Sequence, residues 1–413
     1  MIILIRKIVS SSRKNFFLLF FMLYSSIGAN SQEQELSPFL DYDLKGYFEF
    51  EYRYFPKKDR KRIASQTNQS VAMSFDLFLD FKKPDLSLLI APFARIDQRD
   101  VSRNILDLSE FYLSFTKPKW ELKIGSKKLF WGVLESNHLV DIVNQTNNAE
   151  SFDLEEKLGQ PMVNLTFINE WGSIDLFLLT LNRKRRFVSQ EGRPNTGFEN
   201  ILQNGTFEAK SGDFDYIVRY ENSGDMFDIG AYYFDGLARS PEVMTEFISQ
   251  TPSLTTLYPI VKQLAIDLQI TKSSTLLKLE SLYRESQRED YSAIGLGFEH
   301  TLYGVIDSKI DLGLLFEYHW NNREENLSSQ FSNDLFFGLR VLTNEISDGQ
   351  LLFGILNNLN DGGVVPFLEG SIRLPKNWRL YLEGRLFSHI DSENPLSDLT
   401  DDSYLQLALT KYF

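Results

Sequence analysis

The decisive stretch of this sequence is its last ten residues, Tyr404-Leu405-Gln406-Leu407-Ala408-Leu409-Thr410-Lys411-Tyr412-Phe413. Successive side chains of a β-strand point to opposite faces, so the leucines share one face with Phe413, whereas Gln406, Ala408 and Thr410 occupy the other. This pattern is typical of the strand that closes a transmembrane β-barrel. Lys411 departs from it, because it falls on the apolar face, but near a membrane rim its long stem can carry the ammonium group to water.

The start of the chain predicts export. Basic residues precede the apolar run Phe16–Tyr24, which is too short to span a bilayer. Small residues follow, with Ala29 and Ser31 at the −3 and −1 positions of a cleavage site before Gln32. We therefore expect residues 1–31 to be a secretory signal peptide. The chain has no cysteine, so it carries neither a lipoprotein-type lipidation site nor disulfides.

The composition fits a barrel with a wet interior. Aromatic residues make up 14% of the chain and charged residues 24%, and the two kinds alternate along most of its length. Beyond the leader, no stretch has the 18 consecutive apolar residues that predict a transmembrane helix. The net charge of −13 disfavours a nucleic-acid partner.

One unit recurs along the chain, an amphipathic strand of about ten residues. It predicts a single all-β domain over 44–413, an antiparallel up-and-down transmembrane barrel of about 18 strands, with 16 possible if strands merge within 213–236. The predicted strands are 44–56, 70–82, 86–97, 104–116, 120–131, 159–168, 172–183, 213–221, 226–236, 258–271, 275–287, 290–302, 308–321, 330–343, 349–359, 363–374, 377–389 and 402–413.

The predicted connections alternate in length. Those after even-numbered strands are tight turns, whereas several after odd-numbered strands are long. Short periplasmic turns and long extracellular loops produce this asymmetry, so both termini should face the periplasm. The segment 32–43 before the first strand is too short for a plug domain, which argues against energised uptake.

Charged residues on the faces opposite the apolar ones should line the lumen, because a charge turned to lipid at mid-membrane costs roughly 2–4 kcal/mol. These candidate pore-lining residues are Glu49, Glu51, Arg53, Lys278, Glu280, Arg284, Asp311, Glu317, Arg379, Glu383 and Arg385. They could select solutes by charge, or pair across strands and fill the interior. Since neither sign dominates among them, we expect weak selectivity for simple salts.

The most distinctive local segment runs from Lys127 to Asn144. We expect Trp131 at the outer membrane interface, where an amphipathic ring is favoured. The loop 132–158 carries more apolar residues than a solvated loop needs, so it should fold against the barrel wall or into the mouth. The candidate mouth residues are Trp131, Asp141 and Asn144, and Arg185 and Arg186 in a second, basic loop with Arg183 and Lys184.

Trp131-Gly132 followed by Asp141-x-x-Asn144 resembles a segment of porin-like outer-membrane proteins of Gram-negative bacteria, the group that includes alginate-export-type barrels. Further similar segments are Tyr233-Phe234-Asp235-Gly236 with Pro241, Leu277–Glu280 with Tyr283-Arg284-Glu285, Asp311–Tyr318, Asn333–Arg340, Leu382–Ser388 and Asp401–Leu407. The resemblance implies an outer-membrane barrel in contact with lipid, without naming a substrate. In such barrels the insertion machinery reads the last strand, here ending in Phe413.

The sequence therefore predicts a passive channel for small polar or charged solutes, without a cofactor or metal. One alternative is a lipase-type barrel enzyme, which needs Ser and His side by side near the outer rim. Ser388 and His389 are adjacent, but neighbouring residues on a strand point to opposite faces; a serine elsewhere on the barrel stays open as a partner for His319 or His389. Another alternative is a structural or adhesive barrel with a closed lumen.

Overall fold

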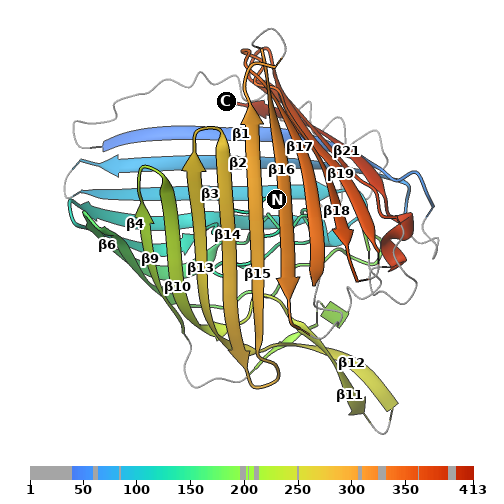
Figure 1. Ribbon diagram of the computed structural model, residues 1–413, viewed down its shortest axis with the longest axis horizontal. Coiled ribbons are helices and arrows are strands. Elements are labelled where there is room, and N and C mark those ends of the chain that lie inside the picture. The colour runs from blue at the N-terminus through green and yellow to red at the C-terminus, as the bar shows by residue number, and fades with distance from the viewer. Residues whose placement is uncertain are drawn as a thin grey trace, which may run out of the picture.

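The computed structural model describes residues 40–58, 64–82, 85–195, 201–202, 204–208, 214–248, 251–305, 309–323, 332–360, 362–388 and 397–413. Eighteen strands form one closed, antiparallel barrel, in which each strand pairs with its neighbour in sequence (Figure 1). The barrel strands are β1 (Leu40–Tyr54), β2 (Thr67–Phe81), β3 (Leu86–Asp97), β4 (Ile105–Lys117), β5 (Trp120–Lys127), β6 (Gln160–Asn169), β7 (Gly172–Leu179), β9 (Asp215–Ser223), β10 (Phe227–Leu237), β13 (Ile260–Lys272), β14 (Thr275–Ser286), β15 (Tyr291–Leu302), β16 (Ile310–Asn321), β17 (Asn333–Thr343), β18 (Gln350–Asn358), β19 (Val364–Leu374), β20 (Trp378–Arg385) and β21 (Tyr404–Tyr412).

The predicted fold class and the count of 18 are confirmed, since each predicted strand overlaps one barrel strand. The predicted signal peptide, and all but the last four residues of the predicted short segment 32–43, lie outside the described residues. Among the described residues, no helix is long and apolar enough to cross a membrane. Two short 3-10 helices, η1 (Val101–Arg103) and η2 (Ser397–Asp401), lie in connections between strands.

The first and last strands close the barrel. β1 pairs with β21 from Tyr47 opposite Tyr412 to Tyr54 opposite Leu405. Beyond the ladder, Phe413 and Gly46 exchange two backbone hydrogen bonds of 3.1 and 3.2 Å. A side chain at position 46 would meet the Phe413 ring, since a Cβ there would lie 2.7 Å from it, so the glycine makes room for the terminal aromatic.

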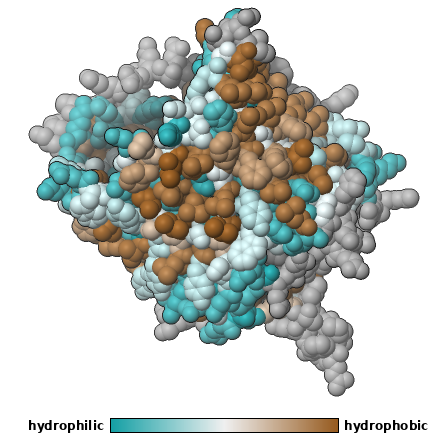
Figure 2. Space-filling model, viewed as in Figure 1, coloured by the Kyte–Doolittle hydropathy of each residue, from teal (hydrophilic) through white to brown (hydrophobic). Residues whose placement is uncertain are grey.

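The outer face is apolar, as the two-residue period requires. Phe413 packs with Phe48 and Phe75 on this face, with ring centroids 5.4 and 5.7 Å away. Figure 2 shows apolar side chains gathered over the strands that face the viewer, with polar ones below them. The ammonium group of Lys411 donates a hydrogen bond to the carbonyl of Lys376 in the adjoining turn, so its charge sits at the rim. Sheet faces so exposed and so apolar fit a lipid environment.

Four of the five tryptophans lie near strand ends. Trp120, Trp171 and Trp378 lie at the end of the barrel where the tight turns are, and Trp320 lies near the opposite end. Three of these rings are at least a third exposed, and that of Trp378 is partly buried. This exposure is expected for rings that anchor a barrel at two membrane interfaces. Trp131 is the exception and is buried.

The two ends of the barrel differ. Turns such as 118–119, 170–171 and 273–274 form one end, which we call the turn end. Longer connections, including 128–159 and 180–214, gather at the other, which we call the loop end. The connections 180–214 and 238–259 pair there into a three-stranded sheet of β8 (Thr206–Phe207), β11 (Glu242–Ile248) and β12 (Thr251–Tyr258). The β11–β12 hairpin projects away from the barrel wall (Figure 1).

Candidate functional site

The connection between β5 and β6, residues 128–159, folds into the barrel, and we call it the lumen loop. β5 ends at Lys127, four residues before the predicted end. Asn144 ties both ends of the lumen loop together: its side-chain oxygen accepts from the Leu129 amide at 2.8 Å, and its amide group donates to the carbonyls of Lys127 and Leu158 at 2.8 and 2.9 Å. The Asn of the Asp-x-x-Asn motif therefore shapes the lumen loop.

Two glutamates on the inner wall hold the backbone of the lumen loop. Glu280 on β14 accepts hydrogen bonds from the amides of Val133 at 2.6 Å, Leu134 at 3.0 Å and Val140 at 3.2 Å. Hydrogen bonds to a carboxylate are stronger than those between neutral groups, and Glu280 is fully buried. Its three backbone donors take the place of a cationic partner.

Glu317 on β16 holds the next part of the lumen loop in the same way. It accepts from the Glu135 amide at 2.6 Å and the Ser136 amide at 2.9 Å, and also from the Ser136 hydroxyl at 2.6 Å. Both glutamates were predicted to line the pore, but the structure uses them to fix the lumen loop to the wall.

The apolar residues of the lumen loop fill one side of the lumen. Val140, Ile142 and Val143 are fully buried in a cluster with Trp131 and inward-facing side chains of β6, β7, β9, β10 and β13 to β15. The Tyr232 hydroxyl adds a hydrogen bond of 2.8 Å to the Val140 carbonyl. This side of the barrel is thus packed like a protein core.

The predicted interfacial position of Trp131 is wrong. Its ring lies inside the barrel, 5.1 Å from the Tyr232 ring and 5.8 Å from the Phe177 ring, with the Arg219 guanidinium 4.4 Å above it. The physical reason is the early end of β5: once the chain leaves the strand at Lys127, Trp131 follows the lumen loop inward. An apolar surface inside the barrel then buries the ring more completely than an interface would.

Two glycines on β15 receive the lumen loop. A Cβ at Gly295 would lie 2.3 Å from Leu134 Cδ1, and one at Gly297 would lie 2.7 Å from Leu134 Cδ2. Only residues without a side chain allow Leu134 to sit this close to the strand. The Gly-Leu-Gly segment is therefore a socket for this leucine.

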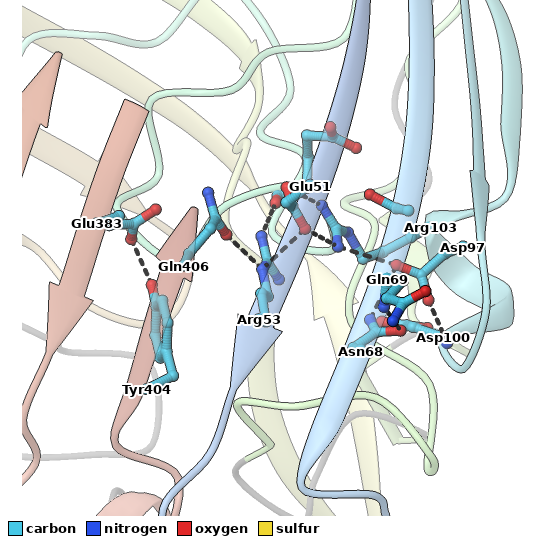
Figure 3. A network of polar contacts seen from close by, with 12 residues as sticks. Glu51, Arg53, Asn68, Gln69, Asp97, Asp100, Arg103, Glu383, Tyr404 and Gln406 are labelled. Atoms are coloured by element: carbon cyan, nitrogen blue, oxygen red, sulfur yellow. Dashed lines mark hydrogen bonds and ion pairs between the residues drawn. The ribbon is translucent and has the colours of Figure 1, made fainter. Parts of the chain in front are cut away.

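On the opposite side, the lumen loop meets a buried network of charges on β1 to β3 (Figure 3). Arg95 contacts Glu49 at 2.8 Å, Glu51 at 3.3 Å and Glu150 of the lumen loop at 2.5 Å. Arg53 donates to the Glu150 carbonyl at 2.9 Å. Glu51 also binds Arg103 of η1, at 2.6 Å. A charge is buried at acceptable cost only when its partners are in place, so this network fixes the lumen loop in one position.

Further contacts carry the lumen loop across the barrel. Glu135 pairs with Arg340 on β17 at 2.5 Å, and Asp153 lies 3.7 Å from Arg385 on β20. Phe152 packs edge-on against Phe387, with ring centroids 5.1 Å apart. The lumen loop therefore touches the wall on both sides.

The basic loop 183–186 supports the lumen loop from the loop end. The Arg183 side chain pairs with Asp107 at 3.0 Å. Arg185 donates to Ser240 Oγ at 2.9 Å and to Gln145 Oε1 at 3.4 Å, and burial lowers the pKa of this arginine to about 10, which leaves it charged at neutral pH.

Arg186 donates to the carbonyl of Ser102 in η1 and, at 3.4 Å, to that of Asn104 just after it, and burial lowers the pKa of Arg186 too. These arginines thus hold loops together, whereas Lys184 is exposed. Asp141, another predicted mouth residue, is buried and pairs with Lys157 at 2.8 Å. Burial still raises the pKa of Asp141 above its ordinary value.

Beside the lumen loop, a chamber of about 1010 Å³ remains open. Its walls come from β1 to β4, from β17 to β21 and from the lumen loop itself. Four of the predicted pore-lining residues face it, namely Glu49, Glu51, Arg53 and Glu383.

The other predicted wall residues have different surroundings. Lys278 pairs with Glu299 at 3.1 Å, and Arg284 donates to Gln263 at 2.6 Å. Near the turn end, Asp311 accepts from the Gly304 amide, and Arg379 pairs with Asp348 of a turn. Arg385 is nearly buried beneath the lumen loop and contacts Glu369 at 2.7 Å and Glu383 at 3.1 Å.

Several chamber residues were not predicted from sequence: Arg95, Glu110, Glu135, Glu150, Asp153, Glu156, Arg340 and Glu369. Half of them lie on the lumen loop, whose course cannot be deduced from strand periodicity. Arg95, Arg340 and Glu369 lie on strands and alternate with apolar residues, so the same face argument, applied to every strand, would have found them.

The structure places one serine against a histidine, Ser136 Oγ 2.9 Å from His319 Nε2. In a catalytic triad, the acid binds the ring nitrogen opposite the serine, but Glu317 contacts the same Nε2, at 3.3 Å, and the serine itself. His319 and Glu317 are fully buried beneath the lumen loop. This arrangement is a hydrogen-bonded support of the lumen loop. His389 lies outside the described residues.

Among the described residues, no cluster of three or more acidic or histidine side chains has the geometry of a metal site. Asn358 and Asn360, the kind of residues that could bind calcium, lie instead at the tight hairpin between β18 and β19, where the Asn358 amide donates to the Gly363 carbonyl at 2.8 Å.

No protein-family model matches the chain, and no curated protein matches it in sequence. Several solved structures, however, are similar to it in fold. OccK8 (OprE) of Pseudomonas aeruginosa has a TM-score of 0.53 at 10% identity, covering 90% of this chain and 98% of that one. OccK11 (OpdR) of the same organism has a TM-score of 0.52 at 11% identity, covering 91% and 96%. At these identities the likeness shows a shared barrel fold.

Proposed function

We propose that this protein is a passive channel of the outer membrane for small polar or charged solutes. One observation carries the proposal: an 18-stranded barrel with an apolar outer face encloses a water-accessible, charged chamber that a folded-in loop narrows. A barrel of this size leaves space beyond what wall side chains fill. The same fold is shared with OccK8 of Pseudomonas aeruginosa along almost the whole barrel.

The proposal includes an orientation. The turn end would face the periplasm with both chain termini, and the loop end would face outward. The last strand, ending in Phe413, would be the element that the insertion machinery of the outer membrane reads. A protease added to intact cells should then cut the β11–β12 hairpin and leave an epitope near the C-terminus untouched.

Within porin-like barrels, we propose that the chain belongs near the alginate-export-type group, on the motifs around Trp131 and Asn144. The structure gives these residues a common role, because both organise the lumen loop. This assignment names no solute.

Conductance across a planar bilayer tests the channel function. Purified, refolded protein should produce discrete current steps in KCl. Heat-modifiable mobility on a denaturing gel verifies that the barrel is folded. A folded barrel that inserts without current steps would overturn the proposal.

That negative result would favour a second candidate, a structural or adhesive barrel. Two observations give this candidate weight: the lumen loop contacts the wall on both sides, and the β11–β12 hairpin projects beyond the barrel.

A further inference from the structure

The chamber lining has an unequal charge balance. Twelve carboxylates and five cationic side chains face the chamber, an excess of seven negative charges. We infer that the chamber favours cations over anions, and that the organic solutes it passes best carry an amine or guanidinium group. This inference rests on the channel function proposed above. It differs from the weak selectivity expected from the sequence, because that expectation left out the lumen loop and strand carboxylates such as Asp76, Asp107, Glu110 and Glu369.

The arginines of the lining are already occupied. Arg53 and Arg95 are buried in the network around Glu51. Arg340 lies between two carboxylates, 2.5 Å from Glu135 and 2.9 Å from Glu299. A guanidinium with two carboxylate partners offers little attraction to a passing anion. These arginines therefore do not make the chamber attract anions.

The two lysines of the lining change this balance little. Lys157 pairs at 2.8 Å with Asp141, which lies outside the lining. Lys128 is the one cationic residue of the lining without an ion pair among the described residues. Two buried cations outside the lining, Arg103 and Arg385, do contact lining carboxylates, but Arg103 also binds Asp97, which lies outside the lining. The excess of carboxylates therefore persists.

Three lining carboxylates have no ion pair within the described part of the chain: Asp76, Glu110 and Glu156. Lys45 stands opposite Asp76 in the β1–β2 register, but its ammonium group binds Asp43 instead. Carboxylates without a direct ion pair in a confined space lower the energy of a cation there and raise that of an anion.

A group of tyrosines near Asp76 suits organic cations. Tyr47 and Tyr412 lie opposite each other on β1 and β21, with ring centroids 5.9 Å apart. The Tyr412 hydroxyl is 2.7 Å from that of Tyr381 on β20. All three line the chamber. Aromatic faces attract ammonium and guanidinium groups, so a carboxylate with nearby aromatic rings recognises such solutes better than it does a bare metal ion.

Reversal potentials across a KCl gradient test the charge preference. The wild-type channel should pass potassium severalfold better than chloride. The triple variant Asp76→Asn, Glu110→Gln, Glu156→Gln should lose a clear part of this preference, because it cuts the excess of carboxylates from seven to four. It should keep its current steps, because the replacements preserve shape. The inference is overturned if the wild-type channel shows clear steps but passes both ions equally or prefers chloride.

A matched control removes three exposed carboxylates away from the chamber, by Glu170→Gln, Asp225→Asn and Glu285→Gln. It changes the net charge by the same amount and should leave the reversal potential unchanged. An equal loss of preference in this control would show that total charge, not the chamber, sets selectivity, and would overturn the inference.

The preference for organic cations is tested by comparing arginine hydrochloride with sodium glutamate in a liposome-swelling assay. Arginine should enter severalfold faster, and the variant Tyr47→Leu, Tyr412→Leu should reduce that advantage with little effect on potassium. Faster entry of glutamate would overturn the inference and leave the channel function standing. Absence of both swelling and current steps would overturn the channel function, and this inference with it.

Discussion

The two sides of the lumen are built from strands with the same alternation of residues, but one side is a packed apolar core and the other is an open, charged chamber. Along β6 to β15, the lumen loop lays Trp131, Val140 and Ile142 over inward-facing apolar side chains, and the space between is a dry core. Along β17 to β21 and β1 to β4, carboxylates of the lumen loop face an open chamber, and carboxylates and arginines of the wall line its other side. The difference shows that a single connecting segment, with one apolar and one acidic face, decides which part of a wide barrel stays wet.

The largest effect should come from removing the part of the lumen loop that separates the two sides. Replacing residues 136–150 with a short Gly-Ser linker should raise single-channel conductance severalfold, because this segment spans the lumen. Planar-bilayer recordings measure it, on protein shown to be folded by its gel mobility. Unchanged conductance in a folded deletion variant would put the lumen loop outside the permeation path.

A smaller effect should follow from loosening the attachment on the dry side. Glu280→Leu leaves three buried backbone amides without their acceptor, at about 1–3 kcal/mol each. We expect noisier open-channel current and faster proteolysis within the lumen loop, with Glu280→Gln intermediate because it keeps one acceptor oxygen. Glu285→Leu, an exposed position on the same strand, is the control. A quiet, protease-resistant Glu280→Leu channel would show that apolar packing alone holds the lumen loop.

The leucine socket offers a milder test of the same side. Gly295→Val places side-chain atoms where Leu134 lies and should cost about 1–3 kcal/mol through overpacking, seen as a lower unfolding temperature. Leu134→Ala in the same chain should restore part of the loss, since it vacates the space. Gly384→Ala is the control, because its new Cβ would meet nothing closer than 3.6 Å. No rescue by the double variant would argue against direct contact as the cause.

The smallest effect should be a change in the ion selectivity of the open chamber with pH. Enclosure by the barrel raises the pKa of Asp153 and of Glu156 on the lumen loop, despite the nearby Arg385 and Lys128. These carboxylates therefore take up protons at a higher pH than free ones and lose their charge first as the pH falls. Cation preference should therefore decline as the pH falls, beginning at a pH at which ordinary carboxylates, with pKa values of about 4, are still ionised. Reversal potentials recorded as the pH is lowered measure it, and a constant preference would contradict the assignment.

Strand periodicity was enough to predict the barrel, because an inward charge next to an outward leucine admits one arrangement in a membrane. It placed Glu49, Glu51 and Arg53 on the chamber wall. It failed for Trp131, since periodicity says nothing about where a strand stops. A signal for the dry side was present in runs that are apolar on both faces, such as Leu176–Leu179 and Ala231–Phe234, which need an apolar cover inside the barrel.

The attachments of the lumen loop also constrain the order in which the barrel can assemble. Val133 and Glu135 belong to the first half of the chain, but the carboxylates that hold their amides come 147 and 182 residues later. Contacts of such long range form late, because the intervening chain must first be brought together. The lumen loop can therefore reach its final place only after β14 and β16 have joined the sheet. Until those two strands are in place, the amides of Val133 and Glu135 lack the carboxylates that hold them.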